Sequence, residues 1–131
     1  MHKPSQALAI GLFVLAAPAA AQTWERIDSM EGVDTFIDLA SLQRDGDEVR
    51  FTEEIRFARP RELGPGLSLD SATSVVRADC RDMSYRVLET TGRLAGRTVV
   101  PTYVPQTGRR EAKRGTLVHA ELERACAGSR R

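Results

Sequence analysis

The sequence predicts an α+β domain, in which an antiparallel β-sheet of about five or six strands carries one C-terminal α-helix on one face. Residues 48–58 and 74–91 alternate apolar and polar side chains, as in a sheet with one solvated face. The C-terminal segment instead places Val118, Leu122 and Cys126 at i, i+4 and i+8. That spacing makes one apolar stripe on a helix, and the stripe needs a sheet to cover it.

The first 21 residues have the pattern of a secretory signal peptide. Lys3 gives a basic start, residues 7–17 are an apolar run, and residues 19–21 are small. Because a bilayer takes about 20 apolar residues to cross, the run is too short to span one, and an uncleaved anchor is the alternative. We expect cleavage to leave one domain at 22–131, with no Cys at its start for lipid attachment and no transmembrane segment.

The charges of the domain balance, with 18 basic and 18 acidic residues. This balance argues against a nucleic-acid-binding protein, which usually has a strong basic excess. The distribution is uneven, since residues 22–70 hold 6 basic and 12 acidic residues and residues 71–131 hold 12 and 6. Such a split could pair two copies into a homodimer. Strands that interleave and mix the charges on one surface are the alternative.

Two short strands, a helical turn and a tight turn are predicted in the first part of the domain. The strands are residues 23–28 and 33–38, and residues 39–43 are expected to form the helical turn. Residues 44–47, Arg-Asp-Gly-Asp, predict the tight turn, because Gly can adopt the positive φ that such a bend needs. Trp24, the single Trp, is expected to anchor the core.

Residues 48–58 form the clearest strand. Glu53 interrupts the apolar row of this strand, so we expect it to lie at a sheet edge or to be paired. The other members of that row are Val49, Phe51, Ile55 and Phe57.

The middle of the chain is predicted to contain a loop, a hairpin and an irregular connection. Residues 60–71 are expected to be the loop, because Pro cannot donate to a strand ladder. The hairpin at 74–91 follows and carries Cys80 on its apolar face. Residues 92–108 are expected to be mostly irregular, with a short strand at 98–100.

The final helix is expected within residues 115–127, with Thr116 as N-cap and Gly128 as C-cap. Its apolar stripe turns Cys126 inward, as the strand pattern does for Cys80. Two cysteines in an exported domain are most simply joined in a disulfide. A catalytic thiol pair is the alternative, although redox cysteines usually lie close together as C-x-x-C.

The sequence contains no catalytic motif. His119 is the single His of residues 22–131, which excludes a metal site built on several His, and a site of two Cys and one His would compete with the disulfide. Neither G-x-S-x-G nor a phosphate-binding glycine loop is present. We therefore predict no enzyme, no cofactor and no metal.

A basic cluster before the helix is the candidate partner-binding patch. It could contact an acidic polymer, an anionic lipid or an acidic protein surface, and a solvated loop is the alternative. Its members are Arg109, Arg110, Lys113 and Arg114.

The order of these features carries a family resemblance. The order is Trp24, TFID at 35–38, Ser41, Arg-Asp-Gly at 44–46, the Gly-rich loop ELGPGLSLDS, Asp79-Cys80, Tyr85 and finally Cys126 in the last helix. In this order the chain resembles the bacterial surface-adhesin protein E-like family. The resemblance implies an antiparallel sheet with the C-terminal helix packed on it, and a disulfide between Cys80 and Cys126. It also implies a family whose founding members lie on the bacterial surface, can dimerise and bind host matrix and plasma proteins.

The resulting functional hypothesis is an exported, disulfide-stabilised binding domain of the cell envelope, adhesin-like, that holds a protein partner. The partner would be a host matrix protein or an envelope component, bound on a sheet face or on the loops at 60–71 and 92–114. The alternative is a periplasmic structural or assembly factor with no host ligand. The expected location is the periplasm, with the outer surface or secretion as alternatives.

Overall fold

The computed structural model describes residues 23–127, together with Gly11. The rest of the predicted signal peptide, its cleavage point and the predicted C-cap Gly128 lie outside the described residues. In the described part of the chain, no helix is long and apolar enough to cross a membrane.

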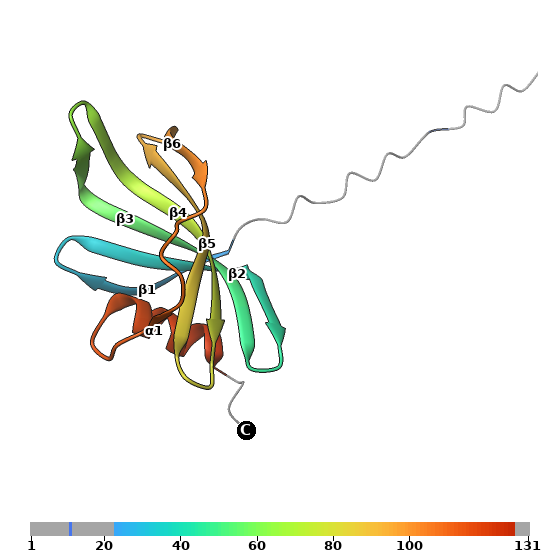
Figure 1. Cartoon of the computed structure of the whole chain (residues 1–131). Coiled ribbons are helices and arrows are strands. Elements are labelled where there is room, and N and C mark those ends of the chain that lie inside the picture. The colour runs from blue at the N-terminus through green and yellow to red at the C-terminus, as the bar shows by residue number, and fades with distance from the viewer. Residues whose placement is uncertain (1–10, 12–22, 128–131) are drawn as a thin grey trace, which may run out of the picture.

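Six strands form one antiparallel meander, in which each strand pairs with the next along the chain (Figure 1). A short seventh strand pairs with the first residues of β5, beyond the end of β6. The predicted α+β class is confirmed. The strands are β1 (Trp24–Met30), β2 (Val33–Asp45), β3 (Glu48–Gly64), β4 (Leu67–Asp79), β5 (Ser84–Leu94), β6 (Arg97–Tyr103) and β7 (Arg110–Glu111).

The helix α1 (Leu117–Cys126) covers one face of the sheet and contacts β1, β2 and β3 (Figure 1). Its predicted N-cap is confirmed, because the Thr116 hydroxyl accepts a hydrogen bond from the backbone N–H of His119. The helix buries Leu122, Ala125 and Cys126 against the sheet. The strands contribute Ile37, Val49, Phe51, Val76 and Ala78 to the same core.

The predicted disulfide joins Cys80, directly after β4, to Cys126, the last residue of α1. The two Cα atoms are 5.6 Å apart, and the residues are separated by 46 positions. In the chain-entropy model a closed loop of this length stabilises the fold by about 4 kcal/mol. The bond fastens the end of the helix to the middle strands of the sheet.

A second attachment of the helix comes from Arg44, near the turn between β2 and β3. Its guanidinium donates to the carbonyl oxygen of Ala125 at 2.7 Å and also to that of Ala127. These carbonyls have no partner within the helix, and the C-terminal end of a helix favours a cation. Arg44 therefore caps α1 from the sheet.

The helical turn predicted at residues 39–43 is wrong, because β2 continues through this segment. Between the pairs Asp38–Thr52 and Gln43–Arg50, four residues of β2 are set against one of β3, which makes a bulge. The Ser41 hydroxyl stabilises the bulge: it donates to the Asp38 carbonyl at 2.6 Å and accepts from the Thr52 N–H at 2.8 Å. Residues that form such local side-chain hydrogen bonds are also common in turns, so the sequence of this bulge resembles a turn.

The loop predicted at residues 60–71 is also wrong, since β3 and β4 extend to a tight turn after Gly64. Pro60 falls in a register shift between Arg56 and Arg61, where no ladder hydrogen bond is required of it. The connection predicted at 92–108 is mostly strand, because β5 and β6 form a hairpin. Only residues 104–108 of that range lie outside a strand or turn.

The expectation for Trp24 is wrong, and that for Glu53 is confirmed in its pairing. Trp24 is half-buried but lies outside the buried core, where it lines an open pocket with Glu54 and Phe57, so the expected core anchor is wrong. Glu53 lies in a central strand rather than at an edge, and it is hydrogen-bonded to Glu121 of α1. The expected pairing of Glu53 is confirmed, with a second acid as its partner.

Candidate functional site

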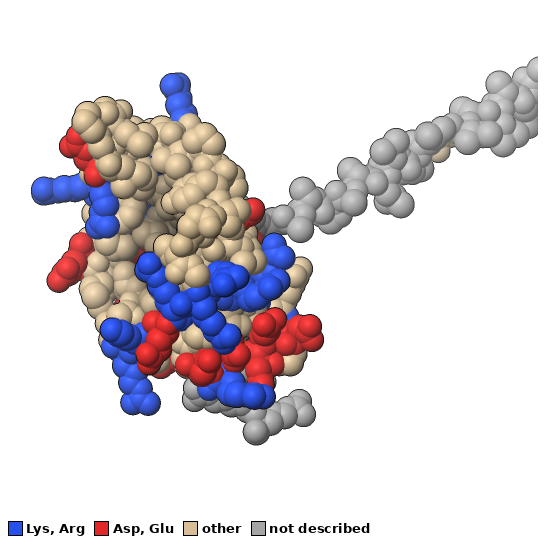
Figure 2. Space-filling view, viewed as in Figure 1, with Lys and Arg blue, Asp and Glu red and all other residues tan. Residues whose placement is uncertain are grey.

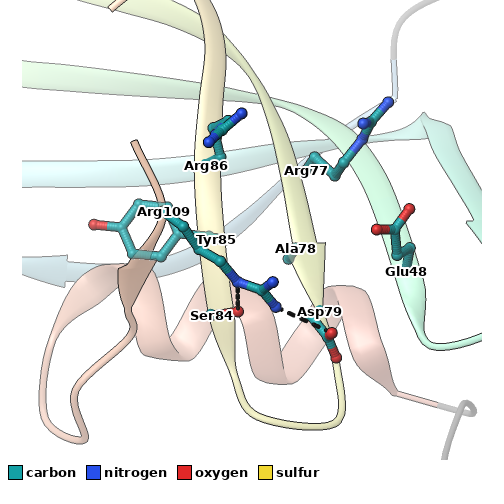
Figure 3. Close-up of a pocket in the computed structure, with 8 residues that line it drawn as sticks. All are labelled: Glu48, Arg77, Ala78, Asp79, Ser84, Tyr85, Arg86 and Arg109. Carbon is teal, nitrogen blue, oxygen red and sulfur yellow. Dashed lines mark hydrogen bonds and ion pairs between the residues drawn. The ribbon is translucent and has the colours of Figure 1, made fainter. Parts of the chain in front are cut away.

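The sheet face opposite α1 carries no helix among the described residues, and we call it the uncovered face. Figure 3 shows α1 behind β4 and β5, with polar side chains in front of these strands. The alternation accounts for this arrangement, because Val76 and Ala78 are buried toward the helix while Arg77, between them, is exposed. This uncovered face is the solvated face that the period of two predicts.

Three arginines lie side by side across the uncovered face, and we call them the arginine row. Arg50 of β3 is directly opposite Arg77 of β4, which is directly opposite Arg86 of β5. All three are exposed. Adjacent strands lie about 4.8 Å apart, so the backbone positions of the row span about 10 Å.

The arginine row is not neutralised within the described chain. None of its three guanidinium groups forms an ion pair or hydrogen bond with another described residue. Like charges directly opposite each other on neighbouring strands are destabilising. The row is therefore a local cost to the fold, of the kind that functional sites often carry.

A pocket of about 230 Å³ lies at this row (Figure 3). Its lining is mainly charged and polar, so it suits a polar or charged group better than an apolar ligand. The lining residues are Glu48, Arg77, Ala78, Asp79, Ser84, Tyr85, Arg86 and Arg109.

Arg109 reaches the rim of this pocket from the segment before β7 (Figure 3). Its Nε donates to the Ser84 hydroxyl at 2.6 Å, and its Nη2 lies 3.1 Å from Asp79 and 3.3 Å from Asp82. Hydrogen bonds from Ser84 lower the pKa of Asp82 below its usual range, and the nearby Arg109 lowers it further. Arg109 is thus held by two carboxylates, in contrast to the arginine row.

Acidic positions border the arginine row on both sides. Two positions from Arg77 along β4, Asp79 is opposite Glu48 of β3. Two positions in the other direction, Val75 is opposite Glu89 of β5. Figure 2 shows Lys and Arg side chains gathered across the middle of this face, with Asp and Glu below them. The positive surface is therefore a narrow stripe rather than a broad basic face.

The predicted basic cluster is divided among different surroundings. Arg109 joins the pocket, while Arg110 lies in β7 opposite Tyr85. Lys113 and Arg114 are exposed on the turn before α1, where Arg114 lines a second pocket with His119 and Glu123. A partner-binding role for these four residues stays a prediction.

The other groups of residues 23–127 that could take part in chemistry are one histidine and two cysteines. His119 Nδ1 lies 3.2 Å from the Glu123 carboxylate one helical turn away. Across residues 23–127, no group of three or more His, Cys, Asp or Glu side chains is placed to hold a metal ion. Both cysteines are in the disulfide.

The arginine row is not among the sites that the sequence predicts. The strand pattern already placed Arg50 and Arg77 on solvated faces, since their neighbours are apolar. It did not show that the two are opposite each other, because the register of β3 on β4 follows from the turn after Gly64 and the bulge near Pro60. The signal in the sequence is the presence of arginines at the solvated positions of neighbouring strands, such as Arg50 and Arg77.

Comparisons with known protein families and with solved structures both point to surface-adhesin protein E. The model of the family described as surface-adhesin protein E matches residues 24–127. A crystal form of Haemophilus influenzae protein E is 14% identical with a TM-score of 0.55, covering 82% of this chain and 97% of that chain. No curated protein sequence matches.

Two further solved structures are similar. The selenomethionine form of Haemophilus influenzae protein E is 15% identical with a TM-score of 0.54, and 82% of this chain and 93% of that chain are covered. Protein E from non-typeable Haemophilus influenzae is 14% identical with a TM-score of 0.52, and the covered shares are 82% and 79%. At these identities the structural likeness establishes a shared fold.

Proposed function

Because this chain belongs to the surface-adhesin protein E family, we propose that it is an exported binding domain of the cell envelope that holds a protein partner on its uncovered sheet face. The predicted signal peptide supports export, and the disulfide suits an oxidising compartment outside the cytoplasm. The proposed location is the periplasm or the outer surface.

The observation that carries this proposal is the arginine row. Three exposed arginines lie at directly paired positions of neighbouring strands, without an ionic partner in the described chain. Interfaces are enriched in Arg, and unpaired charges of one sign favour a partner with the opposite sign. The adhesin family supports a binding role rather than a catalytic one.

The proposal is tested by capture of protein partners on the exported, purified domain. We expect the immobilised domain to retain a defined protein from an extract of envelope or host matrix proteins. The matched control is an Arg77→Gln/Arg86→Gln double variant, which removes two charges of the row and no buried group. A wild-type domain that retains no protein above the level of a blank surface would contradict the proposal.

Protease treatment of intact cells separates this proposal from a periplasmic assembly factor. Digestion of the domain on intact cells would support a partner outside the cell. Protection on intact cells, lost when the outer membrane is opened, would place the partner in the envelope. A homodimer stays a prediction, which the mass in solution measures directly.

A further inference from the structure

We propose that the arginine row binds an extended acidic segment of a partner protein, whose carboxylates pair with Arg50, Arg77 and Arg86. This inference rests on the proposed function and names the chemistry of the partner.

The chemistry of Arg favours a carboxylate. The guanidinium is a planar fork of donors that matches a carboxylate with two parallel hydrogen bonds. In the free domain these donors are exposed to solvent, since no described acid pairs with the row. A bound carboxylate would relieve the repulsion between Arg77 and its two cross-strand neighbours.

The dimensions of the row fit an extended chain that runs across the strands. Alternate side chains of such a chain point the same way and are about 7 Å apart. The outer members of the row, Arg50 and Arg86, are separated by two strand spacings, about 10 Å. Two acidic residues two positions apart therefore come within reach of all three long arginine side chains.

The acidic borders favour a narrow ligand over an anionic membrane. A flat anionic surface laid on the row would also meet Glu48 on one side and Glu89 on the other. The large exposed apolar side chains, which could enter a bilayer, are elsewhere in the fold and none belongs to the row or lines its pocket: Met30, Leu63, Tyr103 and Val104. A single extended chain can follow the stripe and avoid both borders.

The test uses a labelled ten-residue peptide of alternating Glu and Ser, with an alternating Gln and Ser peptide as its neutral control. Binding is followed by fluorescence anisotropy at low salt. We expect the wild-type domain to bind the acidic peptide and Arg77→Gln/Arg86→Gln to bind it at least tenfold more weakly. A matched double variant, Arg59→Gln/Arg97→Gln, removes two exposed arginines outside the row and should change the affinity less than twofold.

Three outcomes would overturn the inference. The first is no binding of the acidic peptide by the wild-type domain. The second is an equal loss of affinity in both double variants, which would show an effect of net charge alone. The third is row-dependent binding to phosphatidylglycerol vesicles without binding to the peptide, which would assign the row to a membrane.

The capture experiment separates this inference from the proposed function. If the Arg77→Gln/Arg86→Gln variant retains the same protein as the wild type, the binding function stands and the arginine row is not its site. If the peptide binds in a row-dependent way but no protein is captured, the chemistry of the row stands and the proposed function is contradicted.

Discussion

Glu53 of β3 and Glu121 of α1 form a buried carboxyl pair between the sheet and the helix. Only 7% of Glu53 and 2% of Glu121 are exposed. Burial raises the pKa of both groups above the usual range, and with the hydrogen bond and the charge of Glu53 it brings that of Glu121 to about 11. The pair therefore keeps at least one proton at neutral pH, and that proton makes the hydrogen bond between the two residues.

The first prediction is a loss of stability as pH rises. Both folded pKa values lie above the unfolded value near 4.5, so the folded pair binds more protons than the unfolded chain above that pH. The contribution of the pair to the free energy of unfolding should be fully present below pH 4.5 and be lost as pH rises toward the folded pKa values, about 11 for Glu121, by at most about 1.4 kcal/mol per pH unit for each retained proton. Urea unfolding between pH 5 and 9 measures this slope.

The control for the pH dependence is Glu121→Gln. An amide can donate to the Glu53 carboxylate without needing a proton from solvent, so the slope should flatten and the variant should exceed the wild type in stability at pH 8. The same slope in the wild type and the variant would contradict the protonated pair.

The second prediction concerns the disulfide. Replacing both cysteines in Cys80→Ser/Cys126→Ser should lower the free energy of unfolding by about 4 kcal/mol, because the unfolded chain regains the entropy of the 46-residue loop. For a domain of this size the melting temperature should fall by roughly 15 °C or more. Calorimetry of wild type and variant checks both values. A shift below about 5 °C would mean that α1 is held mainly by its apolar contacts.

The third prediction concerns Arg44, which caps α1 from the β2–β3 turn. Arg44→Ala should lower the stability by about 1–2 kcal/mol, since the carbonyl oxygens of Ala125 and Ala127 lose a cationic donor at the helix end. The matched control is Arg59→Ala, an exposed arginine in β3 whose loss should change stability by less than about 0.5 kcal/mol. Chemical denaturation compares the two variants, and equal effects would show that the cap contributes nothing specific.

The fourth prediction is a gain in stability from a loss of charge. Arg77→Gln removes the central member of the arginine row and should raise the stability by roughly 0.2–1 kcal/mol at low salt. The gain should shrink as salt screens the exposed charges. Thermal unfolding at two salt concentrations measures it, with Arg97→Gln as the control. A variant less stable than the wild type at low salt would show that Arg77 is not repelled by its neighbours.

The sequence by itself determined the local features of this protein. The period of two placed Arg50 and Arg77 on the solvated face, and the helical spacing placed Cys126 on the buried stripe. Both patterns depend on the residue's own segment, so a single sequence carries them. The antiparallel sheet, the closing helix and the inward position of the two cysteines follow from such patterns.

Local patterns failed where the chain departs from a regular ladder. Ser41 sits in a bulge that resembles a helical turn in sequence, and Pro60 sits in a register shift that resembles a loop. In both places β2 or β3 continues because a neighbouring strand supplies the hydrogen bonds on either side. Those hydrogen bonds come from residues distant in the sequence, which propensity does not describe.

Only the tertiary structure decided which residues meet. It set Arg50, Arg77 and Arg86 in one row and placed Glu121 on Glu53, although the sequence showed only that Glu53 needed a partner. The physical reason is that strand register and helix docking are settled by the sum of many distant contacts, including bulges that shift the register. A one-residue slip of β4 alone would turn Arg77 from the solvated face toward the core.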